Sequence, residues 1–310
     1  MEDRILGLHH ITAIADNAKR NLQFYTETLG LRFVKKTVNF DDPGTYHFYF
    51  GDEHGTPGSI LTFFPWEGIG RGQTGTGMAT EIGYSVPAGS LDFWVERFKT
   101  HNVTHGPIAE RFGEQYLPFE DPDGLKLNLI VSKTADNRQA WETAEVKAAH
   151  ATKGFHSIVL TLRSIGPTAS ILTEVLGYKF LEQDGNRHRF VTDAIPEANI
   201  VDLVESKEPA GRGGGGTNHH VAFRVENDEI LMKFRDKVVK KGLNITQKIN
   251  RDYFFSLYFR EPGGVLFELA TNNPGFTVDE PLDQLGQHLK LPVQYESMRA
   301  DIEKVLPALK

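Results

Sequence analysis

The chain has 310 residues, of which 39% are apolar, and this length and composition predict a globular protein of two domains. It has no cysteine, which excludes disulfides, thiolate nucleophiles and cysteine-bound zinc, so that any metal must be held by nitrogen and oxygen ligands. The formal charge of -7, the lack of a large Lys/Arg cluster and the lack of a long apolar run predict a cytoplasmic protein with neither nucleic acid nor membrane as a partner.

The first module of the chain is predicted to have the element order βαβββ. Residues 10–14 alternate between polar and apolar side chains, which indicates a strand. Asp16 can then cap a helix that ends at Leu29-Gly30, where the glycine supplies the left-handed closing residue. Three further strands are predicted near residues 37–40, 46–50 and 59–64, with turn sequences between them.

Internal repeats extend this module along the chain. Residues 27–33 recur at 174–180, 147 residues later, and residues 121–128 recur at 261–268, 140 residues later. Helices are predicted at the corresponding places, near residues 91–100, 168–176 and 230–241. We therefore expect an α+β fold in which four βαβββ modules form two half-barrel domains, followed by a C-terminal helical tail.

The predicted domain limits follow from the repeats. Residues 1–132 hold the first pair of modules, and residues 154–275 hold the second pair. Residues 133–153 are polar and alanine-rich without strong alternation, which indicates a linker. Residues 276–310 form the predicted helical tail, which either packs on a half-barrel or joins two protomers into a homo-oligomer.

Equivalent positions of the four modules can be compared directly. The first-strand position holds, in chain order, His10, Glu81, Ser157 and His220, and the last-strand position holds Thr62, Asn128, approximately Asp202, and Glu268. If module one pairs with module four, then His10, His220 and Glu268 converge beside the weak ligand Thr62. Two imidazoles and one carboxylate on one face of a metal are typical of non-haem Fe(II) oxygenases, because they leave positions free for substrate and dioxygen.

Alternatives to this interpretation stay open at the sequence level. A histidine pair at the start of a strand is more often a surface or hydrogen-bonded core feature than a ligand, although a carboxylate at Glu268, inside an apolar strand, is costly unless it is paired or metal-bound. Mn(II) and Zn(II) accept the same ligands as Fe(II). A metal-dependent lyase or isomerase of the glyoxalase kind would use them without redox change, and a non-catalytic binder of aromatic toxins would need no complete set of ligands.

Three motifs carry a family resemblance: Gly7-Leu8-His9-His10-Ile11-Thr12, Asn218-His219-His220-Val221-Ala222-Phe223 and Gly263-Gly264-Val265-Leu266-Phe267-Glu268. With them the chain resembles, over essentially its whole length, the vicinal oxygen chelate superfamily of glyoxalase I, bleomycin-resistance proteins and extradiol dioxygenases. It is most similar to the ring-cleaving dioxygenases that act on hydroquinones. The catechol-cleaving members place their first histidine where this chain has Ser157, which favours the hydroquinone branch.

The resemblance implies an Fe(II)-dependent, extradiol-type dioxygenase of aromatic compound degradation, which opens a hydroquinone-like or catechol-like ring and uses a small aromatic diol and dioxygen as substrates. It implies His10, His220 and Glu268 as the iron ligands, in agreement with the repeats. It further implies catalytic roles for five residues, namely His9, Thr12, His219, Arg251 and Tyr258. Each also has a structural interpretation. Strand alternation points His9 and His219 away from the metal. A surface ion pair would account for Arg251, and core packing would account for Tyr258.

Overall fold

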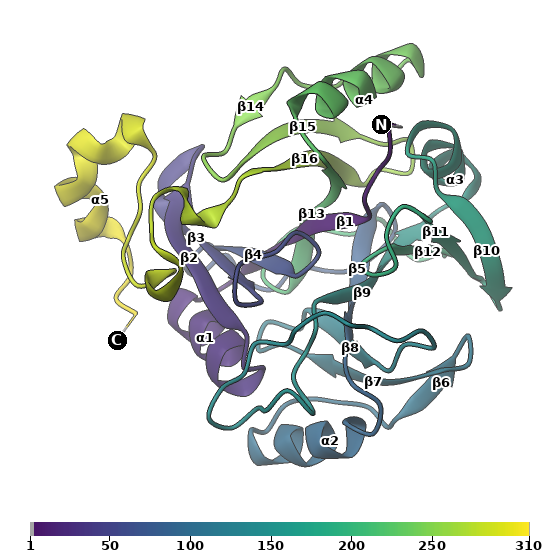
Figure 1. Ribbon diagram of the computed structural model, residues 1–310, viewed down its shortest axis with the longest axis horizontal. Helices are drawn as coiled ribbons and strands as arrows, with labels where there is room; N and C mark the ends of the chain where they lie inside the picture. Colours follow the sequence, from purple (N-terminus) through teal and green to yellow (C-terminus); the bar gives the residue numbers. More distant parts are fainter. Residues whose placement is uncertain (1–2, 310) are drawn as a thin grey trace.

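The computed structural model describes residues 3–309 and contains two curled sheets that lie next to each other, with the helices on the outside (Figure 1). Each sheet has eight strands. The strands of the first sheet are, in spatial order, β14 (Ile249–Asn250), β15 (Phe254–Arg260), β16 (Leu266–Pro274), β13 (Thr217–Val225), β1 (Leu8–Ala15), β4 (Ile60–Pro65), β3 (Asp42–Gly51) and β2 (Arg32–Asn39). Those of the second are β10 (Lys179–Asp184), β11 (Arg187–Val191), β12 (Ile200–Glu205), β9 (Phe155–Leu162), β5 (Met78–Ser85), β8 (Lys126–Ile130), β7 (Glu114–Glu120) and β6 (Ala109–Arg111).

The spatial order of the strands confirms the predicted fold of four modules in two half-barrels. In the first sheet, β1 of module one pairs antiparallel with β13 of module four, and in the second, β5 of module two pairs with β9 of module three. Each half-barrel therefore takes one module from either side of the linker. Every residue of β1 is buried, because one face of the sheet packs on helices and the other lines the interior of the half-barrel.

The helices lie at the predicted places. They are α1 (Ala18–Gln23) with its π-helical continuation η1 (Phe24–Thr28), α2 (Leu91–Thr100), α3 (Gly166–Ser170) with the similar continuation η2 (Ile171–Val175), α4 (Asp228–Lys240) and α5 (Arg299–Val305). No helix within residues 3–309 is long and apolar enough to cross a lipid bilayer.

The capping residue of α1 was predicted wrongly. Asn17, whose backbone is extended, caps the helix by accepting a hydrogen bond of 2.9 Å from the amide of Arg20. The side chain of Asp16 instead accepts from the amide of Gly70, at 2.8 Å, and thereby fastens a loop of the chain that the local sequence could not place. The predicted end of the helix is confirmed, since Gly30 has φ 71°.

The segment after β16 packs on the first half-barrel. It consists of three short 3-10 turns, η3 (Phe276–Val278), η4 (Leu282–Gln284) and η5 (Val293–Met298), before α5. It reaches the edge strand β2, where Leu289 bridges to Lys36, and a buried ion pair of 2.5 Å joins Lys35 to Glu280. The predicted domain limits, at 132, 153 and 275, stay predictions. Residues 1–2 and 310, which belong to the predicted first domain and tail, lie outside the described residues.

Candidate metal centre

Three predicted metal ligands converge on neighbouring strands of the first half-barrel. His10 on β1 and His220 on β13 approach to 3.3 Å between their Nε2 atoms. The Glu268 Oε2 atom on β16 lies 3.1 Å from the first and 2.9 Å from the second. All three side chains are buried, and Ala222, which pairs with both His10 and Glu268, has only a methyl group and leaves room for them.

The donor atoms of these residues fit a divalent cation. Burial lowers the pKa of His220, and although burial alone would raise the pKa of Glu268, the neighbouring His10 and His220 hold it well below its usual range. Neutral imidazole and ionised carboxylate are the forms that bind metals. With metal–ligand distances of about 2.1 Å, neighbouring ligand atoms lie roughly 3.0 Å apart around an octahedral metal. Around a tetrahedral metal they lie roughly 3.4 Å apart. The two distances to Glu268, 3.1 and 2.9 Å, are nearer to the first value, and the 3.3 Å between the two histidines is nearer to the second.

Within residues 3–309 no second group of three such side chains has this spacing. Among residues 3–309, no hydrogen-bond donor is assigned to the buried Oε2 atom of Glu268, whereas Oε1 accepts a hydrogen bond from Ser256 on β15. Oε2 is therefore the oxygen left for a metal. Ser256 was not predicted from the sequence, although strand alternation places it on the same face of β15 as Tyr258.

The side chain of His9 lies against the ring of His10. Its Nε2 atom is 3.0 Å from the carbonyl oxygen of Thr271, and its Nδ1 atom is 2.9 Å from Nδ1 of His10. A carbonyl only accepts, and burial lowers the pKa of His9 well below its usual value, so the one proton of this neutral ring is on Nε2. His10 must then donate from Nδ1, so in the neutral form that binds a metal its lone pair is on Nε2, the atom 3.1 Å from Glu268.

The same arrangement recurs at the second histidine pair. The Nδ1 atoms of His219 and His220 are 2.8 Å apart, and His219 is exposed where His9 is buried. Both His9 and His219 are the extra residue of a β-bulge, because the pairing of β1 with β13 skips one residue at each of these positions. A bulge re-aims a side chain, which brings each of these residues against the ring of the neighbouring histidine.

A cavity of about 430 Å³ opens on the metal-ligand cluster. His10 and His220 reach it from the ligand set, and its walls include His219, Arg251, Tyr258 and the aromatic side chains of Phe40, Phe64, Trp66 and Phe254. Two other inward residues of β3, His47 and Tyr49, also line it and were missed in the sequence, although they alternate along the strand. Thr12 lies beneath the cavity, with its hydroxyl 2.9 Å from Nε2 of His220.

Arg251 and Tyr258 form a polar pair in the wall of this cavity. The Arg251 guanidinium donates from Nε to the Tyr258 hydroxyl at 3.3 Å and also pairs with Asp41 at 3.3 Å. The Tyr258 ring meets the ring of His220 edge-on, with 5.6 Å between the centroids. Burial raises the pKa of Tyr258, which therefore keeps its proton and can donate into the cavity. The surface ion pair expected for Arg251 is present, but it is only one of its contacts.

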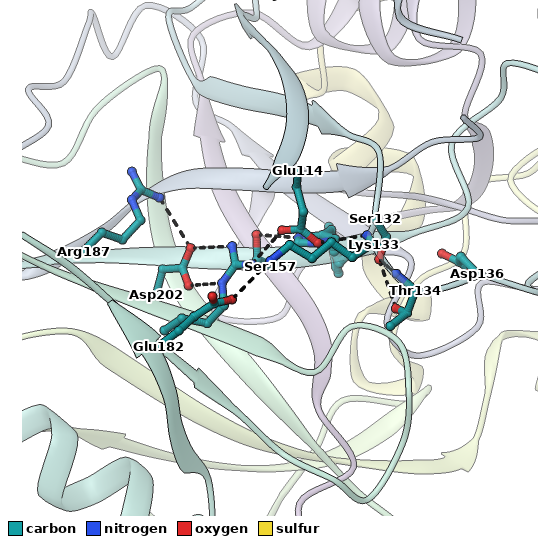
Figure 2. Close-up of polar contacts among 12 residues, drawn as sticks. Glu114, Ser132, Lys133, Thr134, Asp136, Ser157, Glu182, Arg187 and Asp202 are labelled. Atoms are coloured by element: carbon teal, nitrogen blue, oxygen red, sulfur yellow. Dashed lines mark hydrogen bonds and ion pairs between the residues drawn. The ribbon is translucent and has the colours of Figure 1, made fainter. Parts of the chain in front are cut away.

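In the second half-barrel, arginines fill the corresponding place, and its described residues include no group of three ligand-type side chains with this spacing. Arg189 on β11 lies 2.9 Å from Asp202 and 2.6 Å from Glu114, and Arg187 lies 3.0 Å from Glu81. Figure 2 shows Arg187 and Asp202 directed at each other, with Glu114 on the opposite side of the cluster. The gap that remains among these side chains is only about 20 Å³. The guanidinium groups thus balance the charge of the carboxylates Glu81, Glu114 and Asp202.

Comparisons with known proteins agree with this architecture. A chain from Bacillus subtilis strain 168, provisionally named ring-cleaving dioxygenase MhqO, is 43% identical over 310 residues, which cover 99% of this chain and 97% of that one. The chlorohydroquinone/hydroquinone 1,2-dioxygenase of Sphingobium indicum is 34% identical, with coverage of 99% and 97%.

Solved structures show the same fold. The crystal structure of a provisionally named dioxygenase from Bacillus subtilis has a TM-score of 0.95 at 41% identity, covering 99% of this chain and 98% of that one. Glyoxalase I from Zea mays has a TM-score of 0.64 at 16% identity, with coverage of 91% and 97%, and shares the fold alone. The family model of the glyoxalase/bleomycin resistance protein/dioxygenase superfamily matches residues 7–129 and 154–269. The chain therefore belongs to the glyoxalase/bleomycin resistance protein/dioxygenase superfamily.

Proposed function

We propose that the protein is a metal-dependent dioxygenase that opens a hydroquinone-like or catechol-like aromatic ring, with an aromatic diol and dioxygen as its substrates. The observation that carries this proposal is the cluster of three ligand-type side chains, His10, His220 and Glu268, of which the two histidines line a cavity with aromatic walls. The names of the relatives at 43% and 34% identity support the same reaction class.

His10, His220 and Glu268 would hold the metal, for which we propose Fe(II), while Mn(II) and Zn(II) suit the same ligands. When bound, the metal supplies Lewis acidity and one-electron redox chemistry between a diol and dioxygen. The extradiol type, in which the bond beside the coordinated hydroxyl is cleaved, is part of the proposal. His9 acts as a positioning residue, because its proton on Nε2 determines which nitrogen of His10 is free.

The cavity walls would bind the ring and move its protons. Phe64, Trp66 and Phe254 offer apolar faces for a flat aromatic molecule. If His220 donates from Nδ1, its partner His219 carries the remaining proton on Nε2 at the exposed edge of its ring, where it can exchange with substrate. The Tyr258 hydroxyl, which accepts from Arg251, would donate to a substrate oxygen.

The test of the proposed function is an oxygen-electrode assay. Protein loaded with Fe(II) under anaerobic conditions should consume dioxygen and hydroquinone in equimolar amounts, and the variant Glu268→Gln should consume neither. The variant Glu174→Gln, which changes an exposed carboxylate, is the control and should keep full activity. Unchanged uptake in Glu268→Gln would contradict the assignment. Turnover of an aromatic or carbonyl substrate without dioxygen would instead favour the lyase or isomerase alternative.

A further inference from the structure

A continuous line of hydrogen bonds crosses four strands and ends at the metal-ligand cluster. It runs from the Tyr49 hydroxyl to Nδ1 of His47 at 2.9 Å, and from Nε2 of His47 to the Thr62 hydroxyl at 2.9 Å. The hydroxyls of Thr62 and Thr12 are 2.8 Å apart, and that of Thr12 is 2.9 Å from Nε2 of His220. Tyr49, Thr62 and Thr12 are buried. The candidate metal ligand His220 is thus connected, through Thr12, to three residues that do not contact it.

The direction of the first two hydrogen bonds follows from the groups that take part. Among the described residues, the Tyr49 hydroxyl has His47 as its hydrogen-bond partner and no other. A buried O–H without an acceptor costs about 1–3 kcal/mol, so Tyr49 donates to Nδ1 of His47. Burial lowers the pKa of His47 well below its usual value, so the neutral ring has one proton, which is on Nε2. His47 therefore donates to Thr62.

The remaining hydrogen bonds take the same direction. The oxygen of Thr62 accepts from His47, and its own proton has the Thr12 oxygen as acceptor. The Thr12 hydroxyl must then donate toward Nε2 of His220, which requires the lone pair of the His220 ring to be on that atom. If a metal takes that lone pair, the Thr12 hydroxyl loses its acceptor and is left directed at the space beside the metal.

The second half-barrel has no such line. Strand register places Arg189 where the first half-barrel has Tyr49, Asp202 in place of Thr62, and Val159 in place of Thr12. Both half-barrels share the fold, but these three positions all have hydroxyl side chains only in the half-barrel that holds the three ligand-type side chains. We therefore associate the hydroxyls with the metal centre, because the fold does not require them.

We propose that Tyr49, His47 and Thr62 orient the Thr12 hydroxyl as a fixed hydrogen-bond donor to an anionic oxygen or nitrogen ligand at the metal centre, such as a phenolate. Thr12 alone would contact that ligand, and the other three are positioning residues. This inference rests on the proposed metal centre and goes beyond it, because it assigns a donor and the residues that fix its direction. A neutral, directed donor would favour the ionised form of a bound diol.

The direction of the hydrogen bonds can be tested without metal or turnover. Nitrogen-15 NMR of the histidine rings in the metal-free protein should show His47 with its proton on Nε2. The variant Tyr49→Phe removes the donor and keeps the ring, and it should shift His47 to a mixture of the two tautomers. A proton on Nδ1 of His47 in the unaltered protein would overturn the proposed direction.

The donor role can be tested with azide as an anionic probe of the Co(II)-loaded protein, followed by visible absorption. Thr12→Val should raise the dissociation constant of azide roughly tenfold or more, as expected for a lost hydrogen bond to a charged group. Thr62→Val should raise it less, with unchanged Co(II) affinity. The matched control is Thr80→Val, which removes a hydroxyl pair of 2.8 Å with Thr161 in the second half-barrel and should have no effect.

The outcomes separate the two proposals. An azide affinity that Thr12→Val leaves unchanged would overturn the donor role, whatever the enzyme does with dioxygen. A protein that binds no Co(II) would overturn the metal centre and with it the donor role, while the NMR experiment still decides whether the line of hydrogen bonds has the stated direction. Loss of dioxygen uptake with normal azide binding would contradict the proposed reaction and leave the donor role intact.

Discussion

Removing the Ser256 hydroxyl should weaken metal binding without touching a metal ligand. Ser256 donates to Oε1 of Glu268, and both side chains are completely buried. The variant Ser256→Ala leaves this oxygen without a donor, so the carboxylate is free to turn and Oε2 is no longer held toward His10 and His220. Water cannot replace the lost group, because deletion of one oxygen leaves a space smaller than a water molecule.

The expected size of the effect follows from the contacts that are lost. Partners that orient metal ligands typically contribute 10–100-fold in affinity, or about 1.4–2.7 kcal/mol. The complete burial of Ser256 and Glu268 places this change near the upper limit. At a metal concentration about 100 times the original dissociation constant, the stabilisation by metal should fall from about 2.7 to about 0.4 kcal/mol. The thermal shift caused by metal should therefore nearly disappear.

The assay is an anaerobic titration of Fe(II) or Mn(II) in competition with a fluorescent chelator, together with thermal unfolding. The control is Ser170→Ala, which removes an exposed hydrogen bond of 2.8 Å between a serine hydroxyl and the carboxylate of Glu174. It should leave the metal affinity unchanged. If Ser256→Ala binds metal as tightly as the unaltered protein, Oε1 needs no donor and the assignment of Oε2 as the metal-binding oxygen is refuted.

Three further predictions concern the charges of the buried interior. Arg189→Met removes the partner of two buried carboxylates and should lower the free energy of unfolding by about 3–5 kcal/mol in urea titrations. The control Lys304→Met, at an exposed ion pair, should change it by less than about 1 kcal/mol. Burial alone would raise the pKa of Glu114, but His156 and Arg189 lower it to about 2, so its stabilising contribution should be present above its ordinary value of 4.5 and be lost as the pH falls toward 2. Glu114→Gln should remove that part of the acid dependence in calorimetry. Burial raises the pKa of Asp121 to about 7, so stability should fall as the pH rises from 3.8 to about 7, and Asp121→Asn should flatten the melting temperature over this window; an unchanged slope would contradict the shift.

The repeats in the sequence predicted the topology well. The two offsets of 147 and 140 residues align the four modules, and with them the positions where ligands can converge. The pairing of β1 with β13 confirms that modules one and four meet. The structure brings His10, His220 and Glu268 together, while their role as metal ligands stays a prediction. The roles of Thr12, Arg251 and Tyr258 also stay predictions, although all three lie at or beside the cavity.

Other features could not be predicted, because local patterns do not contain them. Strand alternation assumes regular pairing, but a bulge depends on the partner strand, and two bulges turn His9 and His219 toward the metal ligands. The role of Ser256 requires knowledge that β15 lies next to β16. The hydrogen bonds from Tyr49 to Thr12 could be predicted only from the register of β3, β4 and β1.

By itself, the sequence determined the modules, their order and the residue types that can hold a metal, since these depend on periodicity and composition. Only the tertiary structure decided that the equivalent space of the second half-barrel is filled by Arg187 and Arg189, and which atoms of His10 and Glu268 remain free. The physical reason is that a lone pair or a proton is directed by hydrogen-bond partners from strands far apart in the chain. Those partners become neighbours only when the sheet closes.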